Sequence, residues 1–178
     1  QAVHFDNAGL TLVLGNNMDL GGDGSRNGTG KTTIINALSY ALFGNALYNI
    51  KKDNLVNKTN NKGMLVTVDF EMNGTDYRVE RGRKPNIFKF LVNGAGSDGE
   101  ITDEMQGEGR ESQRVIERVI GMSHTMFKHI VALNTYTEPF LSMRATDQRD
   151  MIEQLLGITK LSEKAEILKE LTKISKDK

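Results

Sequence analysis

The sequence predicts an α/β fold in which a glycine-rich loop joins a buried strand to a helix, with an antiparallel β-hairpin subdomain after it. Three observations lead to this prediction. A short apolar run ends at a glycine, a helix with a wide apolar stripe follows a Gly-Lys-Thr sequence, and two Asn-Gly pairs end segments of strand-like composition. The length of 178 residues is sufficient for one well-cored domain.

The first unit is a strand, a loop and a helix. Residues 10–14 are nearly all apolar and end at Gly15, which is typical of a strand buried on both faces. A polar, glycine-rich loop follows as far as Gly30, and residues 31–43 predict a helix that ends at Gly44. Its apolar stripe, suited to packing on a sheet, consists of Ile34, Ile35, Leu38, Ala41 and Leu42.

The middle of the chain predicts antiparallel strands. Apolar and polar residues alternate over 64–72, and Asn73-Gly74 is the strongest short hairpin signal. The returning strand is expected over 77–81, and a further strand over 87–92 leads into a second Asn-Gly pair.

The last third has helical periodicity. Helices are expected over residues 111–120, 125–133 and 147–156. The final segment, residues 159–178, has apolar residues three or four positions apart, which is consistent with the start of a coiled coil. Fewer than three heptads do not distinguish this from a plain amphipathic helix, so both interpretations stay open.

Composition narrows the possible functions. Lys and Arg number 23, as do Asp and Glu, so the fold is not coated in positive charge, although a local basic patch remains possible. The absence of cysteine excludes disulfides and thiolate zinc sites in this segment. No apolar run approaches the length of a membrane span and no signal peptide is visible, so we expect a cytoplasmic protein with no membrane partner.

The loop before the first helix predicts a phosphate-binding site. Glycines let backbone N–H groups wrap closely around a phosphate chain, and the helix N-terminus adds partial positive charge. Lys31 would reach the β- and γ-phosphates of ATP, and the Thr32 hydroxyl would ligate Mg²⁺. A glycine turn that only caps the helix is the disfavoured alternative. The predicted nucleotide-binding residues here are Arg26, Asn27, Gly28, Thr29, Gly30, Lys31, Thr32 and Thr33.

This loop departs from the general pattern at one position. The pattern places a glycine five residues before Gly30, where this chain has Ser25. The simplest account is an insertion of about ten residues between Gly15 and Asn27 that leaves the phosphate-binding half intact. We favour a loose surface loop over a segment that covers the nucleotide, because polar glycine-rich chains bury little surface.

Two other patterns have plain interpretations. Asp69 and Glu71 superficially resemble the acids that bind Mg²⁺ in ATPases, but they alternate within a half-exposed strand, so a structural role is favoured. A basic run beside the hairpin would suit contacts to phosphates, but a solvated face is the favoured interpretation. The run consists of Arg78, Arg81, Arg83 and Lys84.

Four segments together resemble the ATPase subunits of the SbcC/Rad-fifty type, which are similar to SMC proteins within the ABC superclass. The likeness to phage-encoded recombination endonuclease subunits is the strongest. The four segments span nearly the whole chain and are residues 27–44, residues 50–58, residues 127–134 with 139–141, and residues 148–158.

The resemblance implies a P-loop ABC-type ATPase head lobe over residues 1–158, followed by the start of a coiled-coil helix over 159–178. It places Asn57 and Lys58 beside the nucleotide base. Asn134 stands where the family has a glutamine that holds Mg²⁺ and senses the γ-phosphate. The resemblance therefore implies catalytic roles for Lys31 and Asn134, and Mg²⁺ ligation by Thr32 and Asn134.

The resemblance also implies partners. The family builds its head from both ends of a long polypeptide, so the C-terminal half would supply the catalytic acid, and we expect residues 1–178 alone to be inactive. A second copy would form a homodimer around ATP, and the dimer would regulate an SbcD-type metallophosphoesterase nuclease on double-stranded DNA. The alternative is an SMC-like ATPase that tethers DNA without a nuclease. A small-molecule kinase is disfavoured by the hairpin insert and the uncapped final helix.

Overall fold

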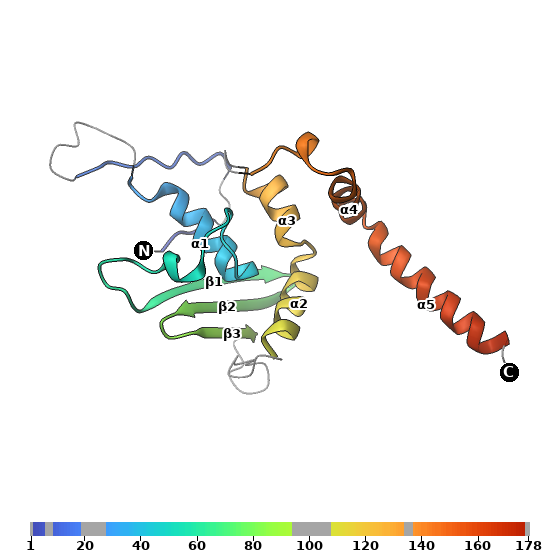
Figure 1. Cartoon of the computed structure of the whole chain (residues 1–178). Coiled ribbons are helices and arrows are strands. Elements are labelled where there is room, and N and C mark those ends of the chain that lie inside the picture. Colours follow the sequence, from blue (N-terminus) through green and yellow to red (C-terminus); the bar gives the residue numbers. More distant parts are fainter. Residues whose placement is uncertain (1, 6–8, 19–27, 94–107, 134–136, 177–178) are drawn as a thin grey trace.

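The computed structural model describes residues 2–5, 9–18, 28–93, 108–133 and 137–176. A three-stranded antiparallel sheet and helix α1 (Lys31–Phe43) form its centre, and helix α2 (Glu108–Ile120) packs beside them (Figure 1). The structure therefore combines helices with the predicted antiparallel hairpin subdomain.

The sheet has the order β1 (Met64–Met72), β2 (Thr75–Arg83), β3 (Ile87–Val92). Asn73 and Gly74 have φ values of 54° and 74°, the left-handed pair that a tight two-residue hairpin turn requires. The register pairs Val68 with Val79 and Phe70 with Tyr77. The predicted strands are thus confirmed, and β2 extends two residues beyond its predicted limits at each end.

Helix α1 has the bounds that the sequence predicts and ends at Gly44. Its apolar stripe packs on the sheet, as expected, and Leu42 and Phe43 reach the core. Stacked rings continue this core across the strands: the ring centroids of Phe70 and Tyr77 are 5.2 Å apart, and those of Tyr77 and Phe90 are 5.7 Å apart. The buried cluster comprises Leu42, Phe43, Leu47, Val79, Phe88, Phe90, Ile116, Phe127 and Ala132.

The remaining described elements are short, apart from the last. They are η1 (Lys52–Leu55), α3 (His124–Met126), the π-helical η2 (Phe127–Val131), η3 (Phe140–Ser142), α4 (Ala145–Leu155) and α5 (Ile158–Lys176). In Figure 1, α5 points away from the sheet towards the C-terminus. It begins one residue before the expected coiled-coil segment, and Ile167, Leu168 and Ile174 are exposed on it. No helix in these ranges combines the length and apolarity needed to cross a membrane.

The helix expected over residues 125–133 is present over 124–131, but it is not a regular α-helix. An α-helical turn begins after Ser123, whose hydroxyl accepts a hydrogen bond from the Met126 amide, and the backbone then widens to a π-helix. The Ala132 amide donates to the Phe127 carbonyl at 2.8 Å, five residues back, where an α-helix would bond four residues back. Apolar periodicity in so short a segment does not distinguish these two helical pitches.

The expectation of a strand over residues 10–14 is also wrong in this structure. The segment has no strand conformation, and the side chains of Leu10, Leu12 and Leu14 are exposed. A strand needs a neighbour to accept its backbone hydrogen bonds. Within the described ranges, the only sheet is the hairpin sheet, and residues 10–14 are not part of it.

Candidate functional site

The turn before α1 has the backbone conformation that a phosphate loop needs. Gly28 and Gly30 have φ values of 74° and 86°, in the left-handed region that glycine enters without strain. Helix α1 begins directly after them, at Lys31. A side chain placed at Gly28 would meet no atom within 4 Å, so the space outside the loop is open to a ligand.

Within the part of the chain that the structure describes, no side chain caps the N-terminus of α1. Gly30, the N-cap residue, has no side chain to accept from the first amides, and the first turn contains no acidic residue. Most helices neutralise these amides with a Ser, Thr, Asp or Asn side chain. The partial positive charge of this helix end favours a bound anion, and a phosphate group is such an anion.

Lys31 adds a full charge at the same place. Its ammonium donates to Thr29 Oγ1 at 3.2 Å, so the side chain folds back along the loop. The side chains of Thr32 and Thr33 are exposed beside it. These residues fit ATP and Mg²⁺ chemically: amides and an ammonium for the phosphates, and a hydroxyl for the metal.

Gly15 lies directly against this loop. A Cβ atom built on Gly15 would lie 1.8 Å from Thr29 Oγ1 and 2.6 Å from Thr29 Cβ, so only glycine permits the approach. The two flanks of the polar insert are thus in contact, which supports the interpretation of an insertion into an otherwise ordinary loop. Two predicted binding residues that precede Gly28, Arg26 and Asn27, lie outside the described residues.

Two other predicted nucleotide contacts, Asn57 and Lys58, lie at the turn that follows η1. The side-chain oxygen of Asn57 accepts from the amides of Thr59 and Asn60, at 2.8 and 3.3 Å, and so serves its own turn. Lys58 is exposed in that turn. Asn134, the predicted metal and γ-phosphate sensor, lies outside the described residues. The roles of Asn57, Lys58 and Asn134 remain predictions.

Asp69 on β1 has structural surroundings, as expected. Asp69 binds the Arg78 guanidinium through both oxygens, at 2.5 and 3.0 Å, on the exposed face of the hairpin. This contact raises the pKa of Arg78. Asp69 is therefore engaged as a cross-strand ion pair.

The interpretation of the basic run as one solvated face is wrong. Residues alternate between faces along β2, so Arg78 faces solvent while Arg81 and Arg83 share the face of the buried Val79. Arg81 lies 3.9 Å above the Phe88 ring and donates to the main chain of α1. The alternation of faces along a strand follows from the sequence alone, and it would have placed Arg78 on the opposite face from Arg81 and Arg83.

Comparison with known proteins finds relatives over most of the chain. The chain is 36% identical to exonuclease subunit 2 of Escherichia phage RB69 over 169 residues, which cover 94% of this chain and 27% of the relative. It is 34% identical to exonuclease subunit 2 of Enterobacteria phage T4, covering 95% of this chain and 28% of that protein. It is 28% identical to the DNA double-strand break repair Rad50 ATPase of Methanococcus maripaludis, covering 90% and 15%.

The chain thus spans about a quarter of the length of its phage relatives. The resemblance to the SbcC/Rad-fifty type, with a phage nuclease subunit among its relatives, is confirmed. Residues 1–178 match the family described as AAA domain. The chain belongs to the AAA domain family.

Proposed function

We propose that this protein is the ATP-binding subunit of a DNA-end-processing recombination or repair nuclease. The observation that carries the proposal is the uncapped, glycine-turned N-terminus of α1 with the Lys31 ammonium folded along it. The relatives add the biological class, since two are named exonuclease subunits and one is named a double-strand break repair ATPase. Those names favour a nuclease complex over a DNA-tethering ATPase without a nuclease.

Each residue of the loop has a distinct role in this proposal. Amides from Gly28 to Lys31 hold the phosphate chain, and Lys31 binds the β- and γ-phosphates as a point charge. Thr32 offers its hydroxyl to Mg²⁺, which neutralises the phosphate charge when bound. Asn134 presents its amide to the metal and the γ-phosphate, while Asn57 and Lys58 approach the base.

The full protein would act as a dimer. We propose that the C-terminal half of the same polypeptide completes the head, and that two heads close on two ATP molecules. Closure would regulate a metallophosphoesterase nuclease partner acting on double-stranded DNA in the cytoplasm. Because Asp69 is held by Arg78, we expect residues 1–178 alone to show no turnover.

The test is calorimetric titration of ATP into the full-length protein. We expect Lys31→Ala to abolish tight binding and Thr32→Ala to weaken its dependence on Mg²⁺. Lys62→Ala is a matched control, since Lys62 is exposed in the turn before β1 and should leave affinity unchanged. Normal ATP binding by Lys31→Ala would overturn the nucleotide site.

A further inference from the structure

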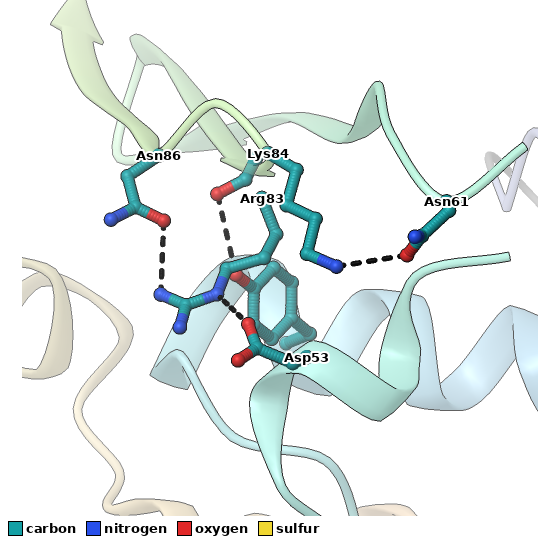
Figure 2. A network of polar contacts seen from close by, with 7 residues as sticks. Asp53, Asn61, Arg83, Lys84 and Asn86 are labelled. Carbon is teal, nitrogen blue, oxygen red and sulfur yellow. Dashed lines mark hydrogen bonds and ion pairs between the residues drawn. The ribbon is translucent and has the colours of Figure 1, made fainter. Parts of the chain in front are cut away.

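A second cationic site lies beside the C-terminal half of α1, at the other end of the helix from the predicted phosphate loop. A hollow of about 150 Å³ opens between the C-terminal half of α1, η1 and the β2–β3 turn. We call it the basic hollow, and its polar and aromatic lining consists of Tyr40, Lys52, Arg81, Arg83, Asn86 and Phe88. Figure 2 shows the polar network around Arg83 at this place.

Positive charge in the basic hollow exceeds negative charge. Three cations line it, and the carboxylate beside them, Asp53, is paired with Arg83 at 2.7 Å and does not itself line the hollow. Lys52 forms no ion pair within the described ranges. Partial desolvation, and then the charges of Arg81 and Arg83, lower the pKa of Lys52, although the residue as a whole is exposed. An anion in the hollow would relieve this repulsion.

The hydrogen-bond donors are held in place before any ligand arrives. Arg83 donates from Nε to Asp53 and from Nη1 to Asn86 Oδ1 at 2.9 Å, which leaves its Nη2 group outside both contacts (Figure 2). The contact with Asn86 uses the oxygen of that amide, so its NH₂ group can still donate. The Lys84 ammonium donates to Asn61 at 2.8 Å and fixes the turn that carries Asn86.

Arg81 contributes charge without being a direct ligand. Its Nε and Nη2 groups donate to Ala41 O at 3.0 Å and Gln113 Oε1 at 2.7 Å, so the guanidinium is fixed towards α1 and α2. The fixed charge lies at the edge of the basic hollow and strengthens the field inside it. The direct donors are therefore Lys52, Arg83 and Asn86.

We propose that the basic hollow is a second phosphate-binding site, in which Lys52, Arg83 and Asn86 bind the oxygens of one phosphate group. The hollow of about 150 Å³ is far larger than the roughly 10–15 Å³ that a cavity needs to hold one water molecule, so it has room for a phosphate group. An ammonium, a guanidinium and an amide NH₂ group can each donate to a different oxygen of a tetrahedral anion. The phosphate is either free in solution or part of a nucleic-acid backbone. The site is separate from the nucleotide loop and does not depend on that assignment.

The experiment uses the full-length protein carrying Lys31→Ala, so that the nucleotide loop does not contribute phosphate binding. Inorganic phosphate is titrated by calorimetry, and a short DNA duplex by fluorescence anisotropy. Lys52→Gln and Arg83→Gln should each weaken binding of at least one probe about tenfold, the expected loss for one charge-assisted contact. Arg78→Gln is the matched control, because it removes the same charge from the opposite face of the same strand.

The two probes distinguish the source of the phosphate. Weaker binding of both probes, or of the duplex alone with a reduced salt dependence, identifies backbone phosphates. Weaker binding of inorganic phosphate alone identifies a free anion. Unchanged binding of both probes by Lys52→Gln and Arg83→Gln overturns the proposal.

Controls address charge and folding. Lys52→Arg keeps the positive charge and should restore binding. Circular dichroism checks that each variant folds, and Asn86→Ala replaces Lys52→Gln if that variant does not fold. In the parent protein, which retains Lys31, ATP affinity should be unaffected by Lys52→Gln, so this site and the nucleotide site fail separately.

Discussion

Arg81 on β2 donates from its Nε atom to the main-chain oxygen of Ala41 in the last turn of α1, at 3.0 Å. Gln113 on α2 joins the same contact, since it accepts from Arg81 at 2.7 Å and donates to the Leu42 carbonyl at 3.0 Å. The last carbonyls of a helix have no partner within the helix. Here the side chains of Arg81 and Gln113 donate to these carbonyls, and the contacts link α1 to β2 and α2.

Replacing Arg81 by Met should destabilise this junction by about 2–3 kcal/mol, because the carbonyl of Ala41 and the amide of Gln113 each lose a charge-assisted partner. Native-state hydrogen exchange in the full-length protein measures the local stability of α1. Arg78→Met removes an exposed, solvent-screened ion pair and should cost far less. Equal costs for the two variants would show that the Arg81 contacts are energetically minor.

Gly15→Ala should lower ATP affinity although Gly15 is remote in sequence from Lys31. The added methyl group would overlap Thr29, whose hydroxyl accepts from the Lys31 ammonium, so the loop must shift. Gly9→Ala is the control, because a methyl group there meets nothing within 4 Å. Calorimetric titration compares the two variants with the parent protein. Unchanged affinity for Gly15→Ala would show that the close approach is not needed for binding.

Ile116→Ala should destabilise the core by about 2–5 kcal/mol, the range for truncating a fully buried aliphatic side chain. Ile116 has 0% exposure and packs from α2 into the cluster beneath α1. Ile152→Ala removes the same atoms from an exposed position on α4 and should cost far less. Hydrogen exchange across β2 and α1 reports both changes. Similar losses would mean that α2 is not an integral part of this core.

Local signals in the sequence predicted most of the fold. Alternation over 64–72 and the Asn73-Gly74 turn fix a hairpin through neighbouring residues, and the bounds of α1 follow from its own stripe and Gly44. The prediction of a strand over residues 10–14 was wrong because a strand depends on a partner strand that the segment itself does not encode. The π-helical pitch of η2 was not predicted because an α-helix and a π-helix give nearly the same apolar pattern over five residues.

The candidate site divides in the same way. The loop residues from Gly28 to Thr33 are contiguous, so their pattern and the helix behind them were enough to predict a turned N-terminus. The contact of Gly15 with Thr29, and the gathering of Lys52 and Arg83 at one hollow, join residues that are distant in sequence. Composition and spacing carry no information about such contacts.

The imidazole of His124 should make the stability of the domain pH-dependent. Its Nε2 atom lies 3.1 Å from the buried Ser39 hydroxyl, and its ring centroid lies 5.4 Å from that of Phe43. Burial, and then the charge of Lys128, lower the pKa of His124 below its ordinary value of 6.5. A lowered pKa means that the folded state favours the neutral ring, while the unfolded state takes up a proton more readily.

The lowered pKa of His124 determines the direction in which stability changes with pH. The contribution of His124 to stability is fully present above pH 6.5 and is lost as the pH falls below 6.5 through the lower folded pKa. His129 has a pKa lowered by the same causes, so it acts in the same direction. Hydrogen exchange at several pH values should therefore show α1 weakening in acid. His124→Gln should flatten this dependence more than His129→Gln, because only His124 contacts Ser39 and Phe43 in the core. An equally steep pH dependence in His124→Gln would assign the effect to other groups.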